Sequence, residues 1–305
     1  MDYSYEIREQ HSVIEKFKSE ALYWDAIYRG ADVTSKIHQR RRKVVLRMIE
    51  QISLPKNAHV LEIGAGAGLT TVELARLGHT VQAIDVVKEM LDLTRQHAAQ
   101  AKVSNRVFPF IGDVHNLHFV ENTFDLVLAI GVLPYLHLPA KAIREMARVA
   151  RPGSYLIITS DNYWRLSYFL DPFKNPLLRP LRNFAMKILN LVRLHSRNVR
   201  PRGHATLVHM YSTKDLMALV SSAQLKGCRI VTVGFGPFTV FGKKILLGSA
   251  GVLLDEKLQQ LAKRNFLGLG RAGSEQILLA RKELPEETYT TAPHVGNLEF
   301  PLLVN

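Results

Sequence analysis

The chain has 305 residues, 47% hydrophobic and 22% charged, which is typical of a globular protein built on one α/β domain with additions. Its single cysteine, Cys228, excludes an internal disulfide framework and favours a reducing cytoplasm. Forty Lys and Arg against 27 Asp and Glu give a net charge of +13, so nucleic acid, anionic lipid and acidic substrates are all partners to consider. We predict neither a secretory signal nor a transmembrane helix.

The first part of the chain, residues 1–54, is predicted to form a helical lid. Aromatic and apolar residues recur there at helical spacing, with Phe17 and Trp24 among them, and a basic helix follows in "HQRRRKVVLRMIEQI". Pro55 and Asn57 end this helix.

Residues 55–160 alternate between strand and helix patterns and form the predicted core. The strands are "AHVLEIGAG", "TVQAIDV", "RVFPFIGD", "FDLVLAIG" and "YLIITSD"; the helices are "LTTVELARLG", "KEMLDLTRQHAAQA" and "AKAIREMARVA"; and "RPGS" is a turn. Strands separated by such helices predict βαβ units. The expected fold is an α/β, doubly wound, Rossmann-like and mostly parallel sheet with helices on both faces.

Two insertions are predicted after this core. Residues 161–210 form a basic helical cap, and the core resumes over 211–283 with helix "STKDLMALVSSAQ", strand "CRIVTVGFG" and a last, antiparallel strand "SEQILLARK". A second, irregular insertion spans 236–273. Both insertions are expected at the rim of the sheet, where such folds bind ligands. Residues 284–305 are a tail without a clear element.

Three glycines stand at every second position in "VLEIGAGAGLTT", where a strand turns into a helix. Without β-carbons at Gly64, Gly66 and Gly68, a ligand can approach backbone N–H groups at the helix N-terminus, although such loops also occur as structural turns. Leu69 stands where a dinucleotide fingerprint requires its third glycine, which argues against a pyrophosphate ligand.

Two acidic residues end the next two strands. Asp85 lies about 20 residues after the glycines, where a carboxylate accepts hydrogen bonds from both ribose hydroxyls of a nucleoside, and it could equally cap the next helix. Asp113 could accept from an exocyclic amino group, with the N–H of Val114 free for a ring nitrogen, or it could be a turn residue.

The segments "VLEIGAGAG", "AIDVVKEML", "GDVHNLHFVENTFDLVLAIGVLPYL" and "AIREMARVARPGSYLIIT" resemble the successive motifs of class I S-adenosylmethionine-dependent methyltransferases. The resemblance covers residues 58–160 closely and 211–282 at the level of topology. It implies S-adenosyl-L-methionine as cofactor. Two departures are "RPGS" in place of the usual "PGG" and Pro134-Tyr135-Leu136-His137 where many relatives carry paired histidines.

The resemblance also implies roles for single residues. The methionine end of the cofactor would lie against Glu62, Gly64, Ala65, Gly66 and Gly68. Its ribose would bind Asp85 and Val86, and its adenine would bind Asp113 and Val114. Its methionyl amine would meet Ile130 and Gly131.

No catalytic residue follows from these motifs, because a sulfonium methyl is already a good electrophile and the protein mainly aligns the acceptor. Rim residues are the candidates: Tyr23, Tyr28, Tyr135, His137, Asp161, Tyr163, His204 and His209. We favour His204 or His209 as general base, with Tyr135 and His137 next, and predict no metal. The expected reaction is methylation of a small or lipid-like acceptor at oxygen. The alternatives are C-methylation of a quinone or polyketide-type ring and a non-catalytic cofactor-binding protein.

The excess positive charge is local, because no acidic residue occurs between Asp171 and Asp215. A helical projection of residues 181–193 gathers apolar residues on one face and basic residues on the other. This pattern fits a lid over the active site, or a peripheral contact with an anionic membrane through residues 174–202. A nucleic-acid partner is disfavoured by the lack of aromatic-basic interleaving, of a zinc site and of a recognition-helix signature. The oligomeric state stays open.

Overall fold

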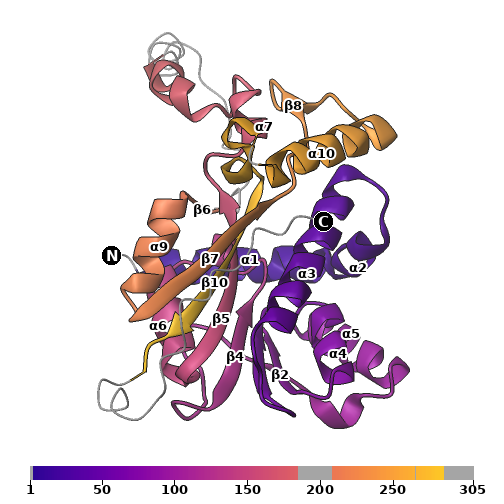
Figure 1. The fold of residues 1–305 in the computed structure, drawn as a ribbon, viewed down its shortest axis with the longest axis vertical. Coiled ribbons are helices and arrows are strands. Elements are labelled where there is room, and N and C mark those ends of the chain that lie inside the picture. Colours follow the sequence, from indigo (N-terminus) through magenta and orange to yellow (C-terminus); the bar gives the residue numbers. More distant parts are fainter. Residues whose placement is uncertain (1–2, 185–207, 265, 285–305) are drawn as a thin grey trace.

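The computed structural model describes residues 3–184, 208–264 and 266–284, and its centre is an eight-stranded sheet (Figure 1). The strand order is β3-β2-β1-β4-β5-β10-β7, with β6 paired to β5. The strands are β1 His59–Ile63, β2 Thr80–Asp85, β3 Val107–Ile111, β4 Phe124–Ala129, β5 Ala150–Asn162, β6 Met210–Tyr211, β7 Leu225–Val233 and β10 Glu275–Lys282. β10 runs antiparallel to both of its neighbours, β5 and β7, and the other described strand pairs of this sheet are parallel. The predicted fold class is confirmed.

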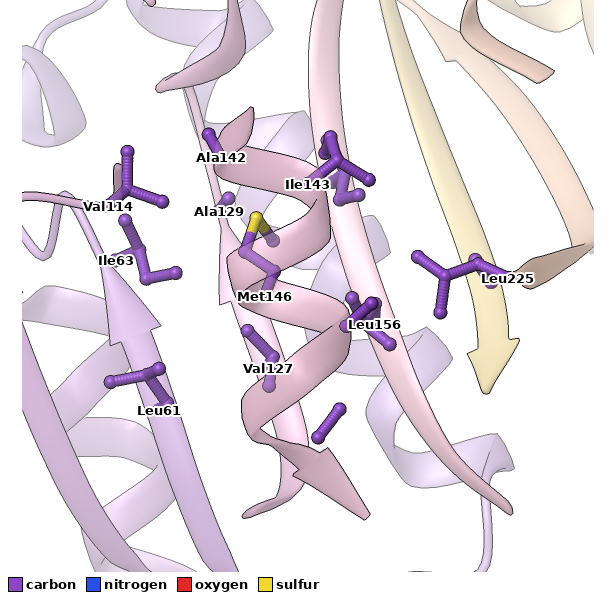
Figure 2. Packing of buried hydrophobic residues seen from close by; sticks show 14 of the residues in the cluster. Leu61, Ile63, Val114, Val127, Ala129, Ala142, Ile143, Met146, Leu156 and Leu225 are labelled. Carbon is purple, nitrogen blue, oxygen red and sulfur yellow. The ribbon is translucent and has the colours of Figure 1, made fainter. Parts of the chain in front are cut away.

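The sheet is buried on both faces because its central strands are almost continuously apolar. Side chains of successive residues point to opposite faces. On one face Leu61 and Ile63 pack against α6 (Pro139–Val149) and α9 (Thr213–Ser221), and Figure 2 shows Ile143 and Met146 of α6 over this face. On the other face Val60 packs against α3 (Val33–Gln51), α4 (Leu69–Arg76) and α5 (Lys88–Gln100).

The N-terminal region is helical, as the sequence predicts. It consists of α1 (Tyr3–Ser19), α2 (Ala21–Ala26), the 3₁₀ turn η1 (Ile27–Arg29) and α3. The side chain of Asp32 caps α3 by accepting hydrogen bonds from the N–H groups of Thr34 and Ser35. Phe17 and Trp24 pack with Val87 and Met90 at the start of α5, so this region covers the carboxyl end of β2.

One predicted turn is part of a strand instead. The segment "RPGS" belongs to β5, which begins at Ala150. Pairing with β4 shifts register here, because Phe124 lies opposite Ala150 while Leu126 lies opposite Tyr155. Gly153 has a φ of +77°, which lets the extra residues bend out without ending the strand.

The first insertion leaves the sheet directly after β5. It contains α7 (Leu166–Phe169) and the 3₁₀ turn η4 (Pro176–Leu178) and is described as far as Phe184. Most of the predicted amphipathic helix 181–193 therefore lies outside the described residues, as do His204 and residues 285–305 of the predicted tail. Two further short turns lie within the core, η2 (Ser104–Arg106) and η3 (Leu133–Tyr135).

The second insertion is more regular than the sequence predicts. It holds a hairpin of β8 (Thr239–Val240) and β9 (Lys243–Lys244), the 16-residue helix α10 (Gly248–Lys263) and the 3₁₀ segment η5 (Phe266–Arg271). Gly248 and Gly251 lie in the first turn of α10, where glycine weakens the helical pattern. Gly251 is needed for close packing, because a β-carbon there would lie 2.6 Å from the carbonyl oxygen of Leu246. Figure 1 shows α7, β8 and α10 together at one end of the molecule.

None of the helices within the described ranges has both the length and the apolar character needed to cross a bilayer.

Candidate active site

A pocket lies at the carboxyl ends of the central strands, beneath the N-terminal helices. It brings together all but one of the predicted cofactor residues, namely Glu62, Gly64, Ala65, Gly66, Asp85, Val86, Asp113, Val114, Ile130 and Gly131. Gly68 is the exception. Parallel strands end at one edge of the sheet, so residues far apart in sequence converge there.

The three glycines share a left-handed backbone but serve different purposes. Their φ angles are +63° at Gly64, +55° at Gly66 and +75° at Gly68. A β-carbon on Gly64 would lie 2.4 Å from Val132, and one on Gly68 would lie 2.6 Å from Thr94 of α5. A β-carbon on Gly66 would meet nothing within 4 Å. Gly66 therefore faces open space in the pocket, while Gly64 and Gly68 permit close packing of the protein itself.

The carboxylate of Asp85 is fixed by two backbone groups. Its oxygens accept hydrogen bonds of 2.9 Å from the N–H groups of Gly66 and Val87. Burial raises the pKa of Asp85, and these backbone hydrogen bonds act against the rise. The interpretation of Asp85 as the cap of α5 is wrong, because Val87 is the N-cap residue and no side chain in the described part of the chain caps this helix. The remaining lone pairs of Asp85 can accept from a ligand, since each carboxylate oxygen accepts more than one hydrogen bond.

Glu62 is a buried carboxylate at the end of β1. It accepts a hydrogen bond from the hydroxyl of Thr71. Burial raises its pKa to about 7, with Thr71 and Arg42 opposing the rise. Such a group ionises readily when a cation binds beside it.

The carboxylate of Asp113 accepts hydrogen bonds from neighbouring residues. One oxygen accepts from the N–H of His115 at 2.9 Å and lies 2.7 Å from His115 Nδ1, and the other accepts from the side chain of Gln10 in α1 at 3.1 Å. Although burial acts to raise it, these hydrogen bonds hold the pKa of Asp113 well below its usual range. Asp113 thus ties α1 to the end of β3 beside the position that the resemblance assigns to adenine.

Beyond Gly131 the pocket has a charged wall. Arg41 of α3 is buried and lies 3.3 Å from Glu275, the first residue of β10. It also donates to the hydroxyl of Tyr28 at 3.3 Å. A β-carbon on Gly131 would come within 3.2 Å of the Arg41 guanidinium, so this cation borders the end of β4 directly.

Several buried polar atoms in this wall lack hydrogen-bond partners within the described part of the chain. They are His38 Nδ1, Arg41 Nε and Glu275 Oε2. His38 Nδ1 lies 3.7 Å from Glu275. Burial and the nearby Arg41 lower the pKa of His38 to about 3, so the ring is neutral at physiological pH. Unpaired buried polar groups are costly, so these atoms are available to bond to a polar ligand or to water in the pocket.

Asp161 supplies a second carboxylate to the same wall. It lies two residues after Thr159, whose hydroxyl accepts from the N–H of Gly131 at 2.7 Å, so both side chains are on the same face of β5. Burial raises the pKa of Asp161, with Glu275 adding to the rise and Arg165, at 3.3 Å, opposing it.

A second wall of the pocket is aromatic and apolar, and it adjoins the charged wall because the ring of Trp24 packs against that of His38. The rings of Phe17 and Tyr135 meet edge to face with centroids 4.9 Å apart, and Trp24 lies 5.6 Å from Phe17. Val13 and Ile14 of α1 complete this wall. The pocket therefore offers an apolar body and a charged end to whatever it binds.

The predicted catalytic residues are dispersed. Tyr135 and His137 line the pocket, and burial raises the pKa of Tyr135 to about 12, so its hydroxyl stays protonated. The ring of His137 packs against His115 at 4.0 Å between centroids. His209 is exposed and outside the pocket lining, and its backbone N–H donates to the carbonyl of Pro134. His204 lies outside the described residues.

The other rim candidates divide in the same way. Tyr28 and Asp161 line the pocket, whereas Tyr23 and Tyr163 do not. The sequence missed His38, Arg41 and Glu275. A usable signal existed for the first two, because His38, Arg41, Val45 and Met48 recur at spacings of three and four residues and share the buried face of α3.

The pocket fits S-adenosylmethionine in three respects. The open space at Gly66 leaves room for a ligand against the backbone, as a cofactor cradle requires. Asp85 offers a fixed carboxylate at the ribose position, and Glu62 offers an ionisable one at the methionine end. Within the described ranges, no cluster of His, Cys, Asp and Glu is arranged to hold a metal ion.

The chain is similar in sequence to known methyltransferases. Residues 61–158 match the family model of a methyltransferase domain. A demethylmenaquinone methyltransferase of Lactiplantibacillus plantarum is 33% identical over 150 residues, which cover 48% of this chain and 61% of that enzyme. A ubiquinone biosynthesis O-methyltransferase of Proteus mirabilis is 23% identical over 233 residues, covering 76% of this chain and 85% of that enzyme.

A solved structure shows the same fold. Magnesium protoporphyrin IX methyltransferase of Synechocystis PCC 6803, with bound S-adenosylhomocysteine, has a TM-score of 0.55 at 16% identity, covering 90% of this chain and 100% of that one. Residues 61–158 therefore form a methyltransferase domain, as the resemblance to class I S-adenosylmethionine-dependent methyltransferases implies.

Proposed function

We propose that the protein transfers a methyl group to an oxygen atom of a small, lipid-like acceptor, with Asp161 as the general base. The carrying observation is the position of Asp161, whose carboxylate lines the pocket just beyond Gly131 with a raised pKa. General bases work best when their pKa approaches the working pH, so burial makes this carboxylate a better base than an exposed one.

When bound, S-adenosylmethionine supplies a sulfonium methyl group that an acceptor oxygen can displace in line. The residues of this chain bind and orient the partners. Asp85 would accept from the ribose hydroxyls, Asp113 would lie beside the adenine, and Glu62 would balance the charge of the methionyl ammonium. The aromatic wall around Phe17, Trp24 and Tyr135 would exclude water from the reacting atoms.

The acceptor hydroxyl must lose its proton as the new carbon–oxygen bond forms. In the proposed reaction its O–H bond breaks, the proton passes to the Asp161 carboxylate, and S-adenosylhomocysteine leaves. His38 is a weaker candidate for this step, because a pKa of about 3 makes its protonation costly. Its neutral ring would instead orient the acceptor by a hydrogen bond.

Two features support a lipid-like acceptor. The pocket joins an apolar wall to a charged end, which suits an amphipathic molecule. In addition, the relatives from Lactiplantibacillus and Proteus both carry a quinone in their names, and the second is named an O-methyltransferase.

The test combines cofactor binding with turnover in two variants. Asp161→Asn should keep the calorimetric affinity for S-adenosylhomocysteine and lose most transfer of labelled methyl to a ring-hydroxylated quinol with an apolar tail. Asp85→Asn should lose affinity by about 30-fold, or about 2 kcal/mol, the scale of a hydrogen bond to a charged group. Asp92→Asn, a half-exposed carboxylate on α5, serves as the matched control.

The product distinguishes the alternatives. A methyl ether, identified by mass spectrometry, supports transfer to oxygen. A methyl group on ring carbon would favour the C-methyltransferase alternative, and cofactor binding without transfer to the quinol or to fractionated lipid extract would favour a non-catalytic binding protein. Full activity in Asp161→Asn would overturn the assignment of the base.

A further inference from the structure

The two insertions meet at an exposed tip. We call the residues Phe173, Lys174, Phe241, Lys243 and Lys244 the cap tip. The rings of Phe173 and Phe241 contact each other edge to face with centroids 5.2 Å apart, although one comes from the first insertion and the other from the β8–β9 hairpin. The amine of Lys174 donates to Thr239 at 3.3 Å. The cap tip is thus one surface made by two distant segments.

A buried carboxylate holds this surface together. Asp171 is fully buried and accepts from the hydroxyl of Thr239 at 2.6 Å and from the N–H groups of Phe173 and Gly242 at 3.0 Å. These three groups belong to both insertions. The aromatic rings of the cap tip are therefore presented on a fixed backbone.

Phe241 occupies a turn position whose backbone conformation is unfavourable for a bulky side chain. It occupies the first position of the two-residue turn between β8 and β9, with a φ of +48°, followed by Gly242 at +76°. Such turns prefer Asn or Asp at this position, and a left-handed conformation is costly for a bulky side chain. Phe241 nonetheless remains 57% exposed, and Phe173 is 59% exposed. A strained residue that also exposes an apolar ring is best explained by what it contacts outside the chain.

The charge around these rings has one sign. No acidic residue occurs over residues 172–184 or 236–254. Lys243 and Lys244 are exposed beside Phe241. Aromatic rings flanked by lysines match the boundary of an anionic bilayer, where rings enter the headgroup region and amines meet lipid phosphates.

We propose that the cap tip docks on anionic lipid bilayers, with Phe173 and Phe241 entering the headgroup region and the lysines against lipid phosphates. The sequence suggested membrane contact only through residues 174–202, much of which lies outside the described residues. The cap tip adds the β8–β9 hairpin, which the sequence did not suggest. Vesicle binding needs no turnover, so this proposal does not depend on the proposed function.

Sedimentation of the full chain with vesicles tests the proposal. Wild-type protein should bind vesicles of phosphatidylcholine mixed with phosphatidylglycerol, and the binding should weaken as salt is added. Lys243→Gln with Lys244→Gln should lower the partition coefficient on these vesicles by about 30-fold, because each lysine near an anionic surface contributes about a fivefold factor and the two factors multiply. Phe241→Asn should also weaken binding while relieving the strained turn.

The controls separate docking from folding and from overall charge. Lys56→Gln with Lys102→Gln removes the same charge near the amino ends of the strands and should leave vesicle binding unchanged. Each variant should bind S-adenosylhomocysteine with the wild-type affinity and unfold at the wild-type urea concentration, which would show that it folds. Three results would each overturn the proposal. The first is a Lys243/Lys244 variant that binds vesicles as strongly as the wild type does, and the second is a Lys56/Lys102 control that loses as much binding as that variant. The third is a wild-type protein that does not bind anionic vesicles.

Discussion

Asp161 and Glu275 lie directly opposite each other on the antiparallel strands β5 and β10, and both line the pocket. Two like charges at paired positions repel, so each needs its own compensation. Arg165 lies 3.3 Å from Asp161, and Arg41 lies 3.3 Å from Glu275. The charged end of the pocket is thus a pair of acids, each held by an arginine from a different element.

Removing Arg41 should destabilise the protein strongly. Arg41→Met leaves Glu275 buried and uncompensated beside Asp161, which should lower the free energy of unfolding by about 3 kcal/mol or more. Urea unfolding measures this loss. Adding Glu275→Gln to Arg41→Met should restore part of it, because the two residues are coupled.

The matched control is Arg76→Met, since Arg76 is more than half exposed and lies 3.7 Å from Glu73. Its effect should stay within about 0.5 kcal/mol. If the double variant were as unstable as the sum of the two single ones, the Arg41–Glu275 interaction would carry no net stabilisation.

The buried carboxyl of Glu62 should make stability depend on pH. Its folded pKa of about 7 lies above the unfolded value of about 4.3, so the folded state binds the extra proton between these values. The stability that this proton confers is fully present below the unfolded pKa and is lost as the pH rises to about 7. Glu62→Gln should remove this component, measured by urea unfolding at about pH 5 and about pH 8.

Cofactor binding should follow the opposite trend. A bound ammonium favours the ionised form of Glu62, so wild-type affinity for S-adenosylhomocysteine should increase as the pH rises towards about 7. Glu62→Gln should flatten this dependence, whereas Glu73→Gln, on the surface of α4, should keep it. A pH profile unchanged in Glu62→Gln would assign the dependence to another group.

Gly66 and Gly68 should respond differently to alanine. Both variants place a side chain in a left-handed backbone at a cost of roughly 1–2 kcal/mol. Gly68→Ala adds a clash with Thr94 at 2.6 Å and should unfold at lower urea concentration than Gly66→Ala. Gly66→Ala should instead lose affinity for S-adenosylhomocysteine, because its methyl enters the open space of the pocket.

Calorimetry and urea unfolding on the same two samples decide the point. Retained affinity in Gly66→Ala would mean that the ligand does not approach this part of the loop. Equal stability of the two variants would mean that α5 moves to accommodate the added methyl.

The core strands and cofactor residues could be predicted because their signals are local. A strand buried on both faces needs a continuous apolar run, as in "HVLEI", and the ligand-binding residues follow such strands immediately. Asp85 and Gly66 are only 19 residues apart, and their hydrogen bond connects two adjacent strand ends.

The charged wall could not be predicted in the same way. Arg41 and Glu275 are separated by 234 residues and meet only when β10 inserts between β5 and β7. Arg41 also stands in a basic run that resembles a solvated helix face. Similarly, the difference between Gly66 and Gly68 depends on Thr94, which lies on another helix. Such contacts are properties of the tertiary structure.

The three successive arginines of α3 each make a different contact. Arg40 pairs with Asp255 in α10, Arg41 with Glu275 in the pocket, and Arg42 donates to the carbonyl of Leu69 at the glycine loop at 2.8 Å. Successive residues of a helix point about 100° apart, so none can replace its neighbour. Three adjacent arginines that look redundant should therefore tolerate substitution poorly. Saturation mutagenesis should find three distinct defects: loss of the α3–α10 contact at Arg40, of the charged end of the pocket at Arg41, and of the glycine loop at Arg42.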